Sequence, residues 1–387
     1  MTSKIEWSIK PLEEAQILMK LRTSLTITFF AITSITPILS AQHVSAHKAS
    51  VLDVPARQAY LKTTSNPLLL STVKGLHSCM KLDPVAAPVG YMRIPHHYLS
   101  GSHGPTNPAE AAATVMYGKF EQRITAGMNQ YVATGSHTEA QCALDQLDTW
   151  AKGNALINYD PHDKDNTQSW YQAEWTLCSA GVTMSVLVND PALDLAEQKR
   201  VALWLDGAAH KLISYEKPGE LGNNHHYWRA LAATSIGVVS SDDALFQYGV
   251  GVFKQAIGQL DKNGAFPLEM ERHERATHYQ GFALQPLVVI AELATRQGID
   301  LYAYKANDHT LRDAIVFFGR AVNDPALIKQ YTPDEQTKGF GADDFAPFVF
   351  YTARYGEDGL APSIIDALKK PLGATRIGGS TTVLAAK

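Results

Sequence analysis

The sequence predicts an all-α protein in which helical hairpins follow one another around a single core. After residue 107, apolar residues recur at helical spacing, and the connections are short and carry Gly, Pro, Asn or Asp. Strand-like alternation is nearly absent, with residues 381–384 as a weak exception. About nine helices joined by tight turns are typical of an α/α toroid or a helical bundle in one domain.

Start and stop signals bound the expected helices. The first begins at Asn107-Pro108, because Asn is a favoured N-cap and Pro a favoured first residue, and it ends before Gly135. The second carries Leu144, Leu147 and Trp150 at helical spacing. The expected helices span residues 108–134, 137–152, 166–189, 194–214, 224–239, 242–260, 272–297, 309–322 and 343–355.

Composition and charge narrow the class of protein. The chain has 387 residues, of which 45% are hydrophobic and 19% are charged. These values fit a globular protein with a substantial core and argue against extensive disorder. The net charge is -4 and the pI is near 6.4, so no strong basic field favours nucleic acid. We therefore expect no nucleic-acid partner. A monomer is also expected.

The first 46 residues have the composition of an export signal. Residues 19–22 read Met-Lys-Leu-Arg, residues 23–39 carry no charge, and small residues follow around Ala41 and Ala46. The apolar run is short for a transmembrane helix and typical of a signal peptide. We assign residues 1–46 to a signal peptide and leader. A periplasmic or secreted protein with no stable membrane insertion is expected, and an uncleaved anchor is the alternative.

The next region is weakly periodic and carries Pro, Ser and His. We expect an extended lead-in over residues 47–107, with a cleft loop at residues 99–105, followed by the helical domain over residues 108–387. Gly and Pro in the loop are the residues that favour turns.

Three cysteines constrain the fold of an exported chain. Two of them should pair in an oxidising compartment. Cys178 lies in an apolar helical stretch and is expected to be a buried free thiol. We therefore pair Cys79 with Cys142. No Cys-X-X-Cys motif is present, which excludes a zinc ribbon.

Two short stretches concentrate more polar chemistry than a fold needs. Residues 222–229 read Gly-Asn-Asn-His-His-Tyr-Trp-Arg, and residues 269–280 read Glu-Met-Glu-Arg-His-Glu-Arg-Ala-Thr-His-Tyr-Gln. A helix start needs one N-cap, which we expect to be Asn223. Arg272 and Tyr279 are seven residues apart and would share one face of a helix. Polar helix starts with no function are the alternative for both stretches.

These residue types suit the removal of a proton next to a carboxylate. We expect Asn224, His225 and Trp228 to face a cleft. An Asn amide and the Arg272 guanidinium can neutralise the negative charge of the intermediate. A neutral His225 at a helix N-terminus can act as base, and Tyr279 can donate a proton or act as base beside cations. This combination predicts β-elimination on a polyuronate.

The same motifs resemble the alginate lyases of polysaccharide lyase family 5. The resemblance rests on Asn-Asn-His-X-Tyr-Trp at residues 223–228, on Arg272 and Tyr279, and on Phe-Ala-Leu-X-Pro-Leu at residues 282–287. Further similarities lie at residues 142–152, 261–269, 298–301 and 376–379. The resemblance covers residues 75–385. It implies an incomplete α/α toroid, with residues 108–387 as its catalytic domain and with no cofactor.

The resemblance also implies roles for individual residues. Asn224 and Arg272 would neutralise the C5 carboxylate, and His225 and Tyr279 would share the acid and base roles. The implied activity is a polyuronate lyase on mannuronate- and/or glucuronate-containing polysaccharide, an anionic partner, with an unsaturated uronate as product. The residues expected to bind substrate are Trp228, Arg376, Tyr171, His278 and His97.

Three positions depart from the family pattern and leave the preferred uronate open. Residues 96–100 lack the Lys that precedes the turn at Gly101-Ser102. Asp344-Phe345-Ala346-Pro347 lacks a Glu, and residues 169–172 lack an Arg. All three are expected to line the substrate cleft.

Other functions are alternatives. Glu269, Glu271 and Glu274 are candidate acids of an inverting glycoside hydrolase, although their close spacing favours salt bridges. Neighbouring His residues such as His225 and His226 point in different directions on a helix, so we expect no metal. A non-catalytic protein that binds acidic polysaccharide would use the same cleft.

Overall fold

The computed structural model describes residues 43–101, 104–216 and 222–387. Most of the expected signal peptide and leader, residues 1–42, lies outside the described residues. Within the described part, no helix is both long and apolar enough to cross a bilayer. Residues 42–387 form one compact unit, and the described portion of this unit contains helices and isolated bridges but no strand.

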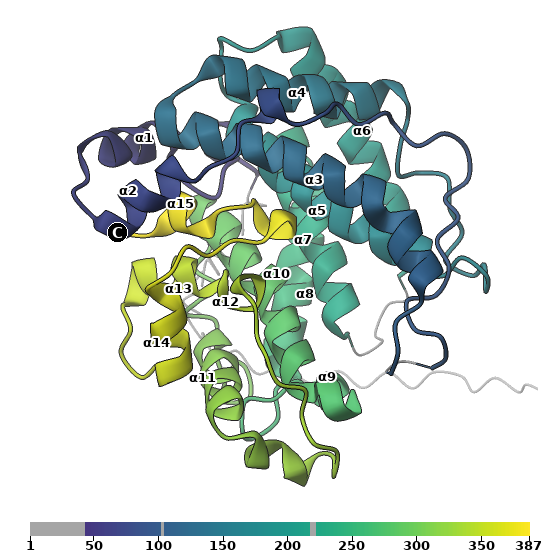
Figure 1. The fold of residues 1–387 in the computed structure, drawn as a ribbon, viewed down its shortest axis with the longest axis vertical. Helices are drawn as coiled ribbons and strands as arrows, with labels where there is room; N and C mark the ends of the chain where they lie inside the picture. Colours follow the sequence, from purple (N-terminus) through teal and green to yellow (C-terminus); the bar gives the residue numbers. More distant parts are fainter. Residues whose placement is uncertain (1–42, 102–103, 217–221) are drawn as a thin grey trace, which may run out of the picture. The chain divides into compact units, whose positions relative to one another are not determined.

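Two concentric sets of helices build this unit (Figure 1). Consecutive inner helices contact one another, and each is followed in the chain by an outer helix that packs against it or against its neighbours. The inner helices are α3 (Pro108–Thr134), α5 (Gln168–Leu187), α7 (Asn224–Ser240), α10 (Ala276–Arg296) and α13 (Phe348–Tyr355). The outer helices are α4 (His137–Lys152), α6 (Leu195–Ile213), α8 (Asp243–Gly258), α11 (Leu311–Asn323) and α14 (Pro362–Leu368).

Burial distinguishes the two sets. The inner helix α5 buries 18 of its 20 residues, whereas the outer helix α6 buries 7 of its 19. A helix that is buried on nearly all sides lies inside, and one with a single apolar stripe lies at the surface. Helix α15 (Thr381–Ala385) contacts both α3 and α13 and so lies between the first and last inner helices. The fold is therefore an α/α toroid, as the sequence predicted.

Several expected elements differ from the structure. The region expected to be an extended lead-in contains two helices, α1 (Val54–Thr63) and α2 (Pro67–Lys74), each with an acidic or amide N-cap followed by Pro. The weak strand signal at the C-terminus is wrong, because those residues form α15. The expected helix over residues 343–355 divides at Pro347 into α12 (Ala342–Phe345) and α13.

The predicted disulfide is present. Cys79 and Cys142 are joined across 63 positions, and Cys178 is a buried free thiol. The bond holds the segment before α3 against α4. Closing a loop of this length restricts the unfolded chain and contributes on the order of 4 kcal/mol of stability.

Candidate active site

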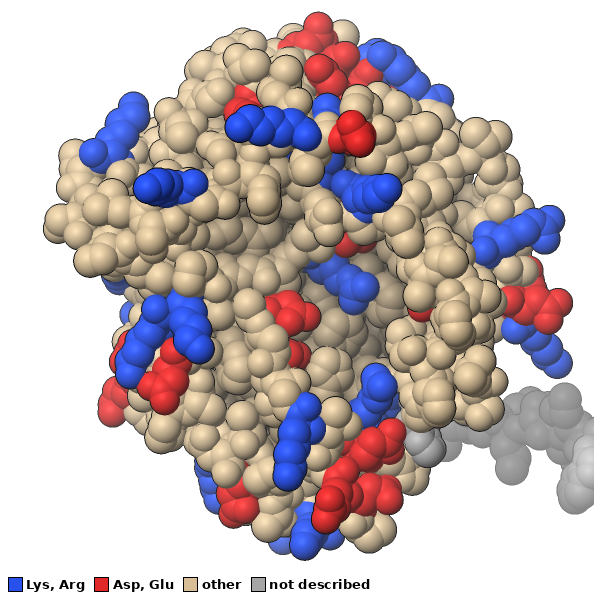
Figure 2. Space-filling view, in the orientation of Figure 1, with Lys and Arg blue, Asp and Glu red and all other residues tan. Residues whose placement is uncertain are grey.

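The predicted site residues gather at one end of the inner helices. Tyr171 lies in the first turn of α5, His225 in the first turn of α7 and Tyr279 in the first turn of α10. Three helix N-termini therefore supply candidate residues, and each N-terminus carries partial positive charge that favours an anion. Figure 2 shows a hollow at the centre of the face drawn, with both basic and acidic side chains in and around it.

The start of α7 follows its predicted capping. Asn223 is the N-cap, and its Oδ1 accepts a hydrogen bond of 3.1 Å from the backbone N–H of His225. Asn224 is fully buried, and its Nδ2 lies 3.1 and 3.0 Å from the two carboxylate oxygens of Glu269. Glu269, in α9 (Pro267–Met270), is also fully buried. Burial raises its pKa to about 7, against the opposing effect of the bonds from Asn224.

His225 is held on two sides. Its Nδ1 lies 2.6 Å from Oε1 of Glu174, which is fully buried in α5. The ring of Tyr171 stacks on the imidazole with centroids 3.8 Å apart. Burial, followed by the charges of Arg229 and other nearby arginines, holds the pKa of His225 well below its usual value. The side chain is 15% exposed, so part of the neutral imidazole is accessible to a ligand.

Tyr279 is positioned by residues from two other segments. Its hydroxyl lies 2.7 Å from the hydroxyl of Tyr98, and the guanidinium of Arg272 lies 4.0 Å from its ring centroid. Arg275 donates a hydrogen bond of 3.2 Å to the Tyr98 hydroxyl. Burial, and then the hydrogen bond with Tyr279, raises the pKa of Tyr98. Two cations therefore lie beside a pair of phenols.

Arg272 and Tyr279 lie close together, as the sequence predicted, but they do not share one helix. The helix that carries Tyr279 begins at Ala276, and Arg272 precedes a separate 3-10 turn, η3 (His273–Arg275). His273 has a φ of 53°, a left-handed conformation that interrupts a helix. The two side chains meet because the chain turns back, so the proximity is correct and the shared helical face is wrong.

Aromatic rings connect the two halves of the site. Trp175 lies 5.8 Å from His225 and 6.2 Å from Phe282, and Phe282 lies 6.2 Å from Tyr279, measured between ring centroids. Arg376, in η5 (Thr375–Ile377), places its guanidinium 4.0 Å from the Trp175 ring. The predicted residue Arg376 therefore lies beside His225.

One predicted sugar contact is wrong. Trp228 is fully buried, and its ring packs 5.0 Å from Phe282. Asn224 and Trp228 are four residues apart and share one buried face of α7, whereas His225 and Arg229 share the face towards α5. Trp228 therefore belongs to the core and cannot form an exposed sugar platform.

Two predicted substrate contacts lie at the surface of the site region. The side chain of His97 is 36% exposed and its Nδ1 lies 3.2 Å from Glu110. The side chain of His278 is 39% exposed and its Nδ1 lies 3.3 Å from Asp344. His97 is among the charges that lower the pKa of His225. Both histidines are accessible to a ligand.

Sequence reasoning missed three residues that hold the site together. Glu174 and Tyr98 were not considered, and Glu269 was given a salt-bridge role. Glu174 was detectable as the one acidic residue within the apolar stretch of α5. Tyr98 is separated from Tyr279 by 181 positions, and no spacing rule connects them. Glu269 binds Asn224, so it is not an exposed catalytic acid of a glycoside hydrolase.

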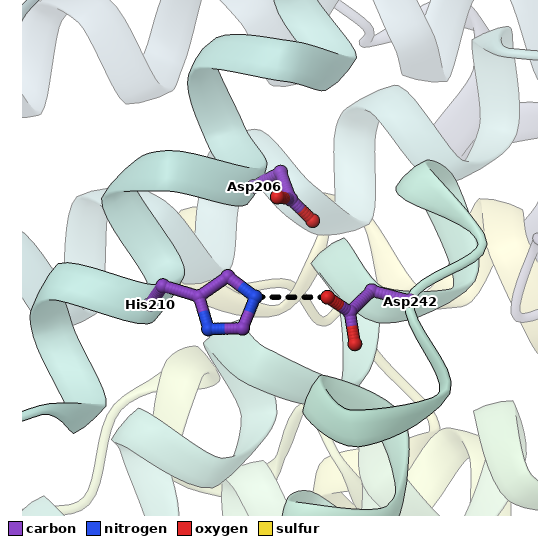
Figure 3. Close-up of side chains that lie close together, drawn as sticks. All are labelled: Asp206, His210 and Asp242. Carbon is purple, nitrogen blue, oxygen red and sulfur yellow. Dashed lines mark hydrogen bonds and ion pairs between the residues drawn. The ribbon is translucent and has the colours of Figure 1, made fainter.

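Among the described residues, one group of side chains has its possible metal-ligand atoms close enough together to hold a metal ion. Asp206 and His210 lie one turn apart on α6, and Asp242 caps α8 (Figure 3). His210 Nε2 lies 2.8 Å from Asp242 Oδ2, and Asp242 Oδ1 accepts the N–H of Leu245. Asp242 follows the C-terminus of α7, whose 17 residues span about 25 Å. This group therefore lies at the opposite end of α7 from His225.

Comparisons with known proteins match most of the chain. Residues 40–328 match the family described as alginate lyase. A polysaccharide lyase of Stenotrophomonas maltophilia is 29% identical, over 86% of this chain and 97% of that protein. An alginate lyase of Pseudomonas syringae pv. tomato is 29% identical over 68% of this chain and 70% of its own length.

Solved structures give the same result. A His-to-Ala variant of alginate lyase A1-III complexed with tetrasaccharide superposes with a TM-score of 0.83 and 39% identity, over 89% of this chain and 97% of that chain. A Tyr-to-Phe variant complexed with tetrasaccharide matches equally well. The same enzyme from Sphingomonas species A1 has a TM-score of 0.81 and 40% identity.

Proposed function

Because the chain belongs to the alginate lyase family and is a polysaccharide lyase, we propose that it cleaves mannuronate- and/or glucuronate-containing polysaccharide by β-elimination. The observation that carries this proposal is the joint position of His225, Tyr279 and Arg272. Arg272 and Arg376 are among the charges that lower the pKa of His225, and the Arg272 guanidinium also lies 4.0 Å from the ring centroid of Tyr279, so an imidazole, a phenol and two guanidinium groups lie in one region. These groups match the three needs of the reaction, which are a base, an acid and a carboxylate partner.

The guanidinium of Arg272 is the main partner of the C5 carboxylate in this mechanism. Pairing with a cation stabilises the negative charge that develops when the C5 proton leaves. Asn224 contributes through its amide, which has two N–H groups. Asn224 is fully buried, and its Nδ2 lies within hydrogen-bond distance of both Glu269 oxygens, so contact with the sugar requires one of these bonds to be exchanged for one to the uronate carboxylate. Arg376 binds a further carboxylate of the chain of sugars.

The elimination then proceeds in two linked proton transfers. A base takes the C5 proton, the C4–O bond breaks as the C4–C5 double bond forms, and an acid protonates the departing oxygen. In mannuronate the C5 proton and the C4 oxygen lie on the same face, so Tyr279 serves as base and then as acid. Where they lie on opposite faces, His225 is the base and Tyr279 the acid. The Arg272 guanidinium beside the Tyr279 ring stabilises charge on the phenol oxygen.

Substrate preference depends on the rim of the hollow. We propose that Tyr171, His97 and His278 contact the sugars, because Tyr171 stacks on His225 and both histidines are accessible. Residues 96–100 carry two histidines and no Lys, and residues 169–172 carry no Arg, so two fixed cations expected at this rim are missing and the electrostatic selection of one uronate is weaker. We also propose that the enzyme is a periplasmic or secreted monomer, with residues 1–46 as signal peptide and leader and residues 108–387 as catalytic domain.

The test is a panel of polymannuronate, polyguluronate, glucuronan and hyaluronan over a range of pH. An unsaturated uronate product raises the ultraviolet absorbance, and we expect this rise with polymannuronate or glucuronan. New reducing ends without a rise would instead identify a hydrolase. Binding with no new ends would identify a binding protein, and both results would overturn the proposal.

A further inference from the structure

A chain of buried charges leads away from His225 into the protein. Oε1 of Glu174 lies 2.6 Å from Nδ1 of His225, and Oε2 of the same carboxylate accepts a hydrogen bond of 2.8 Å from Nη1 of Arg229. His225 and Arg229 are four residues apart on α7, so one carboxylate on α5 spans a single helical turn. Glu174 is fully buried and the Arg229 side chain is 7% exposed.

The chain continues beyond Arg229. Its Nε donates to Glu216, whose other oxygen lies 2.9 Å from Nδ1 of His226. The Arg229 guanidinium also stacks over the Trp170 ring at 4.0 Å. One guanidinium therefore binds two carboxylates and an aromatic face, which fixes its position closely.

Arg229 is the strongest of the groups that oppose the effect of burial on the pKa of Glu174, and Arg376 adds a smaller effect. Burial raises the pKa of Glu174 well above its usual value, and the charge and hydrogen bond of Arg229 act against that rise. An arginine keeps its charge at any pH that a folded protein survives. The other titratable or charged groups around Glu174 are Tyr159, Tyr171, Cys178, Glu216, His225, Tyr248 and Arg376.

The ionisation of Glu174 decides which nitrogen of His225 carries the proton. A carboxylate only accepts hydrogen bonds, so it requires N–H at Nδ1 and leaves a lone pair on Nε2. A protonated Glu174 would donate its O–H to Nδ1 and place the hydrogen on Nε2. The heavy atoms need not move. His225 would change from a proton acceptor to a donor on its free side.

We propose that Arg229 is a positioning residue for this reaction: it holds Glu174 as a carboxylate and thereby fixes His225 with its proton on Nδ1 and its Nε2 lone pair available to substrate. This inference rests on the proposed function in one respect, the role of His225 as a base. Glu174 and Arg229 act through His225 and do not themselves contact the sugar.

The test is the tautomer of His225 in the full chain, measured from the nitrogen-15 resonances of its imidazole at neutral pH. The sequence has 14 histidines, and His225→Gln identifies the resonances of this one. We expect the proton on Nδ1 in the unchanged protein and in Arg229→Lys, which keeps the charge. In Arg229→Gln we expect it on Nε2. Arg354→Gln, which removes a partner of Glu292, is the matched control and leaves the resonances unchanged.

A proton on Nε2 in the unchanged protein, or the same tautomer in Arg229→Gln as in the unchanged protein, would overturn the inference. If Arg229→Gln does not fold, the inference is tested on the unchanged protein and on Arg229→Lys. A proton on Nδ1 in both supports the inference, and one on Nε2 in either overturns it. The measurement needs no turnover, so a chain inactive on every polyuronate would refute the proposed function separately.

Discussion

The two sides of the candidate site are built differently. On one side, His225 is fixed by a stacked ring and by a carboxylate that is itself bound to Arg229, all on the helices α5 and α7. On the other side, Tyr279 on α10 meets side chains from irregular segments, namely Tyr98 and Arg272. We call these the helical side and the loop side.

This difference in construction suggests that catalysis and substrate selection depend on different segments of the chain. Helices packed on all sides hold a side chain in one geometry, which acid and base catalysis requires. Loops adapt in sequence and shape, and they carry binding residues on a rigid scaffold. Of the three departures from the family pattern, the one at residues 96–100 lies on the loop side, and Asp344, in the short helix α12, lies beside it, 3.3 Å from Nδ1 of His278. We therefore expect substitutions of the proton-transferring residues, His225 and Tyr279, to change kcat, and substitutions at the rim, such as those of His97 and His278, to change the preferred polymer.

The largest expected effect is that of Tyr279→Phe, which removes the hydroxyl that the loop side holds through Tyr98. If Tyr279 transfers protons, kcat falls on the order of 10³-fold, within the range for general acid–base groups. Lyase kinetics on the preferred polymer measure this. Tyr117→Phe is the matched control, because Tyr117 packs on Trp150 in the core, and it should retain its rate. Equal rates for the two variants would contradict the role of Tyr279.

The next largest effect is the pH dependence of stability that Glu269 causes. Glu269 is hydrogen-bonded to Asn224, the neighbour of His225. Its folded pKa of about 7 lies above the usual value of 4.5. A raised pKa means that the folded state holds the proton more tightly, so its stabilising effect is full below pH 4.5 and is lost as pH rises through 7. Relative to Glu269→Gln, the unfolding free energy should fall by about 3 kcal/mol across this window. Chemical denaturation at several pH values measures it, and parallel pH curves would contradict the assignment.

The smallest expected effect is the loss of the hydrogen bond by which Tyr98 positions Tyr279. Tyr98→Phe removes the hydrogen bond to Tyr279 and should lower kcat about tenfold, the value of one hydrogen bond of roughly 1.4 kcal/mol. Tyr91→Phe, which loses a bond to Asp163 in the same N-terminal region, is the control. A larger loss for Tyr98→Phe than for Tyr279→Phe would reverse the assignment of the phenols.

The sequence predicted the parts of the fold that follow from local signals. Residues 108–134 and 137–152 match α3 and α4 because caps and Gly135 mark their ends. Helix α2 was missed although Asn66-Pro67 repeats the Asn-Pro signal, because eight residues give too short a periodic stretch.

The site was predicted in its chemistry more than in its geometry. Asn223 as N-cap follows from its position at a helix start. A neutral His225 was predicted from the same position, but burial and the nearby arginines are what lower its pKa. The Tyr98–Tyr279 contact depends on chain topology, and the break before Ala276 depends on a left-handed residue that is not Gly. The burial of Trp228 depends on which face of α7 meets α10. Local sequence patterns cannot predict these three features.

The most direct test is a crystal structure of Tyr279→Phe with a mannuronate tetrasaccharide. We expect one C5 carboxylate within hydrogen-bond distance of Arg272 and Asn224. We also expect the C5–H of that sugar to face the position of the missing Tyr279 oxygen, with His225 Nε2 towards the same ring. A tetrasaccharide bound elsewhere, or with its C5–H turned away from both Tyr279 and His225, would contradict the proposed mechanism.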